Sequence, residues 1–423
     1  MGFRDLVDGI RTVKDPISVN YDMKNASESS GNEPLLFSEI IESPGQRAVT
    51  NILTRHRLCE AFNIEPGELI DMLSWAMENP TDTILLDVGS ASVLENRMEH
   101  TDISVLPIPW HYREDGGRYQ SSSIIIAQYA GQRNTSFHRQ LLKGPDRTTV
   151  RLVPRHLRTM ADLAFENNED VPIAVVNGPD PLVLLAAAMS FNEPIDELRV
   201  ASALHERLYG AKLELVELPN GVQVPAESEY AMEARITTNL DDEGPYVDIT
   251  GTVDDIRQER VIEYDSIYHR NEPIFHALIP AGVEHMTLMG MPRAPTIKTA
   301  VSEVVTCTDV YLTDGGSGWL SSVVQIIPEK SGDSMRAIQA ALDGHKSMKQ
   351  VIVVDTDIDV TNSTRVEWAL MTRWQPDRDT LILSDQKGSS LDPSRSQDGT
   401  TSKIGFDATI EPGADRTPFE SVL

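Results

Sequence analysis

The stretch YAMEARITTNLDDEGPYVDITGTV, Tyr230–Val253, joins two β-like runs through a Gly-Pro-Tyr turn. Its flanks are rich in Tyr, Ile, Val and Thr, which favour strands, and Gly and Pro mark the turn between them. Two acids, Glu243 and Asp248, therefore stand on opposite sides of a stiff turn. Taken alone, the local sequence favours a solvated acidic loop. The alternative is a pair of carboxylates held at a site.

Short β-like pieces recur on both sides of this stretch, from about residue 105 to residue 290. Examples are SSSIIIAQYA, TTVRLVP, VPIAVVNG, LELVELP and VIEYDSIYH. Turn residues divide them, and DELRVASALHERLYG is a clear helix candidate among them. Many short strands separated by turns predict a closed or partly closed β-barrel.

The two ends of the chain differ from this β-rich middle. Helix-like and strand-like blocks alternate before it, which predicts a small α/β domain. After it, SSVVQIIP, KQVIVVDTDI and DTLILSD alternate with helix-like blocks, which predicts a mainly parallel sheet. The expected fold class is α/β with several domains, and the expected divisions are residues 1–104, 105–295 and 296–423. The last of these is expected to end in a loop-rich tail that begins at Asp385.

Composition excludes several partners. The chain has 423 residues and a formal charge of −28, so its surface repels nucleic acid and anionic membranes. Its N-terminus lacks the apolar core of a signal peptide, and its longest apolar run, DPLVLLAAAMSF, is too short to span a bilayer. Cys59 and Cys307 lie far apart and predict two reduced, buried thiols. We expect a soluble cytoplasmic protein.

Individual polar residues are weak signals by themselves. Arg139, in RNTSFHRQ, has the planar fork that matches a carboxylate, although a solvated turn is the simpler interpretation. Asn134, His156 and Glu197 together offer an amide oxygen, an imidazole and a carboxylate, a set that suits Mn²⁺ or Mg²⁺. Their spacing alone does not make a site. No dinucleotide fingerprint, P-loop, GxSxG or HExxH sequence occurs in the chain.

Several motifs in one order resemble the UbiD family of decarboxylases, which use prenylated flavin mononucleotide. The similarity runs from about Asn134 to Thr409 and depends on these segments: RNTSFHRQ, RLVPRHL, PIDELRVASAL, LVELPNGVQVPAESE, EGPYVDITG, HKSMKQVIVVDTDID, VEWALMTRWQPDRD and TSKIGFDAT. The resemblance implies a small α/β domain, a flavin-reductase-like split β-barrel and a C-terminal α/β domain.

The resemblance also implies a set of site residues. Arg139, Glu243 and Asp248 match the family's catalytic arginine and acids, and Asn134, His156 and Glu197 match its Mn²⁺ ligands, with Mg²⁺ as the alternative metal and K⁺ as a further cation. Arg155, beside His156, is the alternative match for the family histidine. Val247 departs from the Gly that many members carry there. The implied contacts of prenylated FMN are Asn134, Phe137, His138, Arg139, Arg151, Leu152, Val153, Lys349 and Lys403.

The implied reaction removes CO₂ from an unsaturated or aromatic acid. Asp248 is our expected proton donor, and Glu243 is expected to be coupled to Arg139. RLVPRHL and EWALMTRWQPDRD are more similar to archaeal members, which implies trans-anhydromevalonate 5-phosphate as substrate and isopentenyl phosphate as product. Arg155 and Arg158 are candidates for binding the substrate phosphate.

Two alternatives remain at this point. One is decarboxylation of 4-hydroxy-3-polyprenylbenzoate in quinone synthesis, and the other is a non-catalytic flavin-binding homologue. The resemblance further implies a UbiX-type flavin prenyltransferase as cofactor supplier. It also implies a homodimer or a hexamer built from dimers.

Overall fold

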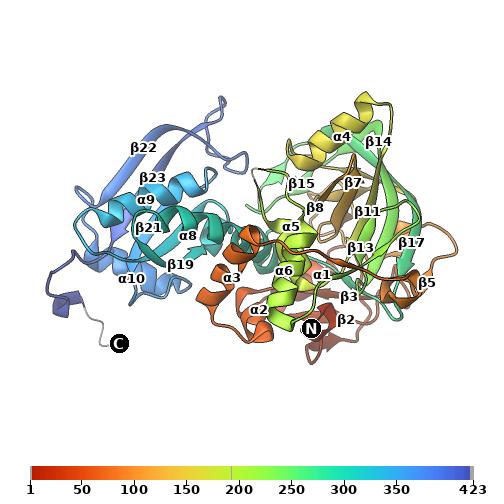
Figure 1. Ribbon diagram of the computed structural model, residues 1–423, viewed down its shortest axis with the longest axis horizontal. Helices are drawn as coiled ribbons and strands as arrows, with labels where there is room; N and C mark the ends of the chain where they lie inside the picture. The colour runs from red at the N-terminus through yellow and green to blue at the C-terminus, as the bar shows by residue number, and fades with distance from the viewer. Residues whose placement is uncertain (1, 192, 420–423) are drawn as a thin grey trace. The chain divides into compact units, whose positions relative to one another are not determined.

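The computed structural model describes residues 2–191 and 193–419, which fall into two compact units (Figure 1). The first unit lies within residues 1–63 and 76–288, and the second within 64–75 and 289–423. Two helices, α3 (Pro66–Glu78) and α7 (Val283–Gly290), run across the boundaries between these segments.

The first unit is built on a nine-stranded, antiparallel sheet. Its order is β6-β9-β10-β17-β14-β11-β7-β8, with β5 paired to β17. Two strands, β14 and β17, are far longer than the others and lie side by side (Figure 1). The strands are β5 (Asn96–Arg97), β6 (Tyr119–Gln120), β7 (Ile124–Tyr129), β8 (Gln132–Phe137), β9 (Gln140–Leu142), β10 (Arg147–Val150), β11 (Val171–Asn177), β14 (Tyr230–Glu243) and β17 (Arg257–His269).

Alternate residues of these strands face one core, as the two-residue period of a strand requires. On β14, Met232, Ala234 and Ile236 are buried in it, together with Ile173 and Val175 of β11. The helix α4 (His156–Glu166) covers this face, and its core residues recur at three- and four-residue intervals. Its contribution to the core is Leu157, Met160, Ala161 and Ala164.

Smaller sheets complete the first unit. One is four-stranded, in the order β1 (Arg11–Val13), β2 (Leu35–Phe37), β3 (Arg47–Thr50) and β18 (Ile274–His276). Another contains β13 (Gln223–Pro225), β12 (Glu214–Glu217) and β4 (Ile84–Leu85), and a hairpin pairs β15 (Tyr246–Val247) with β16 (Val253–Asp254). The remaining helices are α1 (Asp22–Ser29), α2 (Arg55–Phe62), α5 (Pro181–Ala188) and α6 (Glu197–Tyr209).

The second unit is a five-stranded sheet with helices on both faces. Its order is β19 (Thr306–Leu312), β20 (Ser321–Ile327), β21 (Gln350–Asp355), β23 (Thr400–Ala408) and β22 (Thr380–Lys387). Val351 and Val353 pack with α8 (Ala294–Ser302) and α9 (Asp333–Gly344), whereas Ile352 and Val354 pack with α10 (Ser363–Arg373). Burial on both faces explains the uninterrupted apolar run of β21.

The structure confirms the α/β fold class predicted from the sequence. The parallel pairing of β20 with β21 was expected, and so was helix α6. The predicted strand DTLILSD is β22, but it pairs antiparallel with β23. The tail expected to be loop-rich contains β23, whose few apolar residues gave little sign of a strand and which pairs in parallel with β21. The first unit includes a sheet in which β18 joins strands from the N-terminal region. The three-domain division and the split-barrel form stay predictions.

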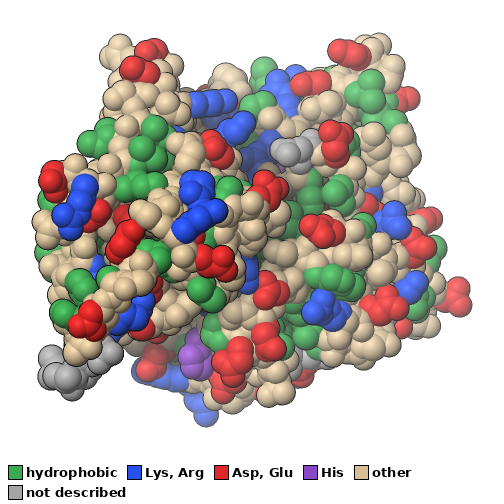
Figure 2. All heavy atoms as spheres, turned by 60° about the vertical axis from the view of Figure 1, so that its left-hand side comes forward, with side chains coloured by type: hydrophobic (Ala, Val, Ile, Leu, Met, Phe, Trp, Pro, Cys, Tyr) green, Lys and Arg blue, Asp and Glu red, His purple; other side chains and the backbone are tan. Residues whose placement is uncertain are grey.

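Cys59 and Cys307 are buried and form no disulfide, as expected. No helix in the described part of the chain is long and apolar enough to cross a membrane. On the face seen in Figure 2, acidic side chains are scattered among basic and apolar ones, consistent with the even spread of Asp and Glu along the sequence.

Candidate active site

The predicted turn between Glu243 and Asp248 is a compact corner of the first unit. Glu243 ends β14, and Asp248 directly follows β15. Gly244 has φ +103°, and a Cβ atom there would lie 2.8 Å from the carbonyl oxygen of Asp255, so glycine is required. Gly116 is equally constrained, because its Cβ would lie 2.4 Å from the carbonyl oxygen of Gly244.

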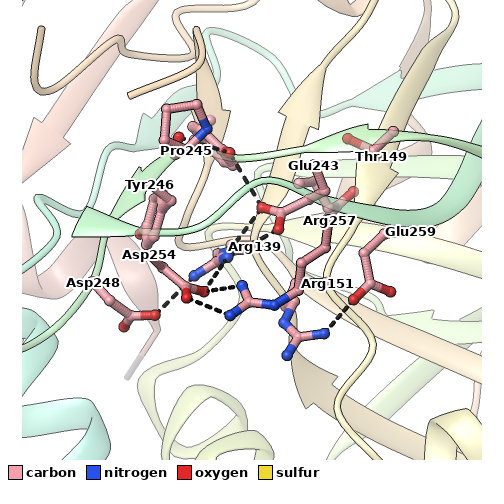
Figure 3. Close-up of polar contacts among 12 residues, drawn as sticks. Arg139, Thr149, Arg151, Glu243, Pro245, Tyr246, Asp248, Asp254, Arg257 and Glu259 are labelled. Atoms are coloured by element: carbon pink, nitrogen blue, oxygen red, sulfur yellow. Dashed lines mark hydrogen bonds and ion pairs between the residues drawn. The ribbon is translucent and has the colours of Figure 1, made fainter. Parts of the chain in front are cut away.

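The corner brings Arg139 to both predicted acids (Figure 3). Arg139 lies between β8 and β9, and its Nε and Nη2 atoms each donate to Glu243 at 2.9 Å. Nη1 donates to Asp248 Oδ2 at 2.8 Å. A bidentate guanidinium–carboxylate pair is among the stronger polar contacts in proteins. Glu243 is fully buried, whereas the side chain of Asp248 is 23% exposed.

A third acid, Asp254, also binds Arg139. It ends β16 and accepts a hydrogen bond from Nη2 at 2.8 Å. Among the described residues, the guanidinium thus uses four of its five N–H groups on three carboxylates, which leaves one N–H on Nη1. Asp254 was not predicted from the sequence, because its approach to Arg139 depends on the register of the β15–β16 hairpin.

Two tyrosines line the same cluster. The Tyr246 ring lies under the guanidinium, with 4.6 Å between its centroid and Arg139 Cζ. Tyr119 donates its hydroxyl to Glu243 Oε1 at 3.2 Å. Burial raises the pKa of both phenols, so they stay protonated hydrogen-bond donors. Neither was singled out in the sequence, where nothing distinguishes them from core tyrosines.

A buried acid supports the corner from behind. Asp115 accepts hydrogen bonds from the backbone N–H groups of Val247, at 2.7 Å, and Tyr112, at 3.1 Å. Burial raises the pKa of Asp115 to about 6. Because Val247 precedes Asp248, this acid fixes the backbone that carries the predicted proton donor.

A second polar cluster contains two of the predicted metal ligands. Glu197, at the start of α6, accepts from Asn134 Nδ2 at 3.0 Å and from the backbone N–H of Thr135 at 2.7 Å. Burial raises the pKa of Glu197 to about 8. A buried carboxylate whose contacts are all to neutral donors suits a cation, because a cation would supply the missing positive charge.

The predicted histidine ligand is placed differently. His156 begins α4 and, within the described residues, bonds to neither Asn134 nor Glu197. His138 is linked to Asn134 through the hydroxyl of Ser136. Among residues 2–191 and 193–419, no three or more His, Cys, Asp or Glu side chains are grouped so that they could hold a metal ion. A site at Asn134 and Glu197 would therefore combine an amide oxygen with a carboxylate.

The other predicted cofactor contacts lie in two places. Phe137 and His138 follow the path of β8, and the Arg151–Val153 segment follows β10, with Arg151 paired to Glu259 (Figure 3). Leu152 is buried and Val153 is exposed. In the second unit, Lys349 pairs with Asp392 at 3.0 Å, and Lys403 donates to the carbonyl oxygen of Lys346 at 2.6 Å.

The two arginines proposed for a substrate phosphate have different partners. Arg158 pairs with Asp162 one helical turn away, at 2.9 Å. Arg155 donates to the hydroxyl of Ser190. Among the described residues, Arg155 has no acidic partner, so its charge is the less neutralised of the two.

Comparisons with known proteins match nearly the whole chain. Residues 86–283 match the family model of the 3-octaprenyl-4-hydroxybenzoate carboxy-lyase (UbiD) Rift-related domain, and residues 286–408 match that of its C-terminal domain. The anhydromevalonate phosphate decarboxylase of Methanosarcina mazei is 38% identical, over 97% of this chain and 96% of its own. The enzyme of the same name from Archaeoglobus fulgidus is 42% identical, over 94% and 93%.

A solved structure is similar throughout. The UbiD-class enzyme HmfF from Pelotomaculum thermopropionicum, in complex with FMN, superposes with a TM-score of 0.94 at 32% identity, over 100% of this chain and 97% of its own. An evolved dimeric form of the same enzyme, in complex with prenylated FMN (prFMN), has a TM-score of 0.89 at 30% identity, over 98% and 96%.

Proposed function

Because the chain belongs to the UbiD family of carboxy-lyases, we propose that it decarboxylates trans-anhydromevalonate 5-phosphate to isopentenyl phosphate and CO₂. The observation that carries this proposal is the similarity, over nearly the full length of both chains, to archaeal enzymes named anhydromevalonate phosphate decarboxylase. The intact cluster of Arg139, Glu243 and Asp248 supports a catalytic rather than a purely binding role.

We propose prenylated FMN as the cofactor, since it is bound by a structural relative that is 30% identical. When bound, it would supply the electron sink that an acid losing CO₂ requires. Residues of β8 and of the segments after β8 and β10 would contact it: Asn134, Phe137, His138, Arg139, Arg151, Leu152 and Val153. Lys349 is proposed for its phosphate, and Lys403 is proposed as a further contact.

We propose that Asn134 and Glu197 hold a divalent cation, Mn²⁺ or Mg²⁺, with His156 as the third ligand. The buried, uncompensated carboxylate of Glu197 supports this assignment. K⁺ is proposed as a further cation. A UbiX-type flavin prenyltransferase would supply the cofactor, and a homodimer or a hexamer of dimers is the proposed assembly.

The contacts of Arg139 favour different roles for Glu243 and Asp248. Glu243 is buried and bound on both oxygens by Arg139, so it is held as a carboxylate in a fixed position. Asp248 is bound by Arg139 through one oxygen and is partly exposed, so it is freer to exchange a proton. Asp248 would donate this proton to the substrate carbon after CO₂ leaves. The remaining N–H of Arg139 would bind the substrate carboxylate before that step.

Arg155 is the better candidate for the substrate phosphate, since its guanidinium has no acidic partner among the described residues. A comparison of two carboxylic acids as substrates distinguishes the two candidate activities. The protein, produced with a flavin prenyltransferase, should release CO₂ from trans-anhydromevalonate 5-phosphate and not from 4-hydroxy-3-polyprenylbenzoate. The opposite preference would contradict the proposed substrate and leave the family reaction intact.

A further inference from the structure

Two cross-strand pairs converge on Arg139 from one corner of the sheet. The β14–β17 ladder places Arg257 opposite Glu243. The β15–β16 hairpin places Asp254 opposite Tyr246, the residue whose ring lies under the Arg139 guanidinium. Residues directly opposite each other across antiparallel strands lie close enough for their side chains to interact. The same backbone pairing that positions Glu243 and Tyr246 therefore brings Asp254 and Arg257 to the cluster.

Asp254 bridges two guanidinium groups (Figure 3). Its Oδ2 atom accepts from Arg139 Nη2 at 2.8 Å and from Arg257 Nη1 at 2.6 Å. Its Oδ1 atom accepts from Arg257 Nη2 at 2.7 Å and from the backbone N–H of Asp255 at 3.0 Å. Both carboxylate oxygens of Asp254 are thus occupied. Arg257 binds both of them, and Asp254 in turn binds Arg139.

The carboxylate of Asp254, which bridges Arg139 and Arg257, stays charged at neutral pH. Burial by itself would raise the pKa of Asp254, but the hydrogen bonds from Arg257 and Arg139 bring that pKa down to about 2. Asp254 is therefore not a proton donor. Without its charge, the two guanidiniums would face each other with no carboxylate between them, and like charges at that separation repel.

In this cluster the acids outnumber the arginines by one. Arg139 and Arg257 carry two positive charges, and Glu243 and Asp254 carry two negative charges, so Asp248 is the unmatched carboxyl. The other titratable groups that act on this cluster are Asp115, Tyr119, Tyr246 and His285. Changing the charge of Asp254 or of Arg257 must therefore alter how readily the remaining acid gives up its proton.

We propose that Asp254, held by Arg257, is a positioning residue for decarboxylation: it fixes Arg139 in its bidentate contact with Glu243 and supplies the negative charge that keeps a proton on the donating acid. This inference rests on the proposed function, in which Asp248 donates that proton. Asp254 acts through Arg139 and does not touch the reacting atoms.

The test compares Asp254→Asn with Asp255→Asn in the flavin-loaded enzyme. Both variants remove one negative charge from the same turn, but Asp255 is exposed and its side chain lies outside the network. Asp254→Asn should lower kcat about tenfold to a hundredfold with little change in KM. The alkaline limb of its pH–rate profile should move about one pH unit lower, because the donating acid loses its proton more easily. Asp255→Asn should match the wild type.

Arg257→Gln supplies the opposite charge change. It removes a positive charge, so its alkaline limb should move to higher pH even though its kcat also falls. A purely structural role would lower activity in both variants without moving the limbs in opposite directions. Superposable profiles for Asp254→Asn and Asp255→Asn, or shifts of one sign in Asp254→Asn and Arg257→Gln, would overturn the inference.

A substrate-free readout separates this inference from the proposed function. The absorbance of the bound flavin, titrated with pH in the same variants, should show the same opposite shifts. No CO₂ release by the flavin-loaded wild type would contradict the proposed function, whereas unchanged absorbance titrations in Asp254→Asn and Arg257→Gln would contradict the role of Asp254.

Discussion

Arg139 binds both carboxylate oxygens of Glu243, at 2.9 Å each, although the two residues are 104 positions apart in the sequence. Glu243 is fully buried, and its only other side-chain partner among the described residues is the hydroxyl of Tyr119. A buried carboxylate of this kind depends on its cation for stability as well as for function.

Arg139→Ala should therefore destabilise the protein by about 3–5 kcal/mol, because it leaves Glu243 buried without a counter-charge. The matched control is Arg235→Ala. Arg235 also contacts three acids, Asp170, Glu263 and Asp265, but its side chain is 38% exposed. We expect the control to cost less than about 1 kcal/mol. Urea unfolding measures both values, and equal losses would contradict the importance of burial at Arg139.

Asp248→Asn should lower kcat by roughly a hundredfold or more, since an amide cannot donate the proton of a carboxylic acid. The amount of retained flavin should not change. Asp241→Asn is the control, because Asp241 belongs to the same acidic stretch but pairs with Lys143 at 3.7 Å, outside the cluster. Deuterium incorporation into the product in D₂O reports the protonation step. Wild-type rates in Asp248→Asn would assign the proton to another group.

Asp115, the buried acid that accepts from the backbone N–H of Val247, should make the unfolding free energy depend on pH. Folding raises the pKa of Asp115 from 3.8 to about 6, so the folded state binds more protons than the unfolded state between those values. The contribution of Asp115 to stability must then fall as pH rises from about 4 to about 6. The difference in unfolding free energy, wild type minus Asp115→Asn, should become more negative over this range. A difference that is constant with pH would show that Asp115 does not titrate there.

Removal of the buried acid of the second cluster tests the proposed metal site. Glu197→Gln should lose most of its bound Mn²⁺, measured as metal per protein after dialysis, because a neutral amide binds a hard cation more weakly than a carboxylate does. Asp196→Asn is the control, since Asp196 is adjacent in sequence but pairs with Arg133 at 2.7 Å. Equal metal content in Glu197→Gln and the wild type would exclude Glu197 as a ligand.

Much of the fold was predictable because its signals are local. The blocks that became α6, α9 and α10 carry a helical apolar period, and the unbroken apolar run of β21 matches a strand buried on both faces. The participation of β18 in the N-terminal sheet was not predictable, because Ile274 and Arg47 become neighbours only through tertiary structure.

The residues of the candidate site were likewise predictable only in part. The resemblance pointed to Arg139, Glu243 and Asp248, and the structure places their side chains in contact, while their catalytic roles stay predictions. Asp254 and Arg257 were not found because TVDDIRQ is an ordinary polar turn until the register of β14, β15, β16 and β17 is known. A two-residue shift of either ladder would take them away from Arg139.

The most direct test of the account is the rate of CO₂ release from trans-anhydromevalonate 5-phosphate by wild type and Glu243→Gln, each produced with a flavin prenyltransferase and loaded to the same flavin content. We predict isopentenyl phosphate formation by the wild type and a loss of at least about a hundredfold in Glu243→Gln, because the bidentate contact with Arg139 needs both carboxylate oxygens. Equal turnover by the two proteins would contradict the catalytic role of Glu243, and no CO₂ release by the loaded wild type would contradict the proposed decarboxylation.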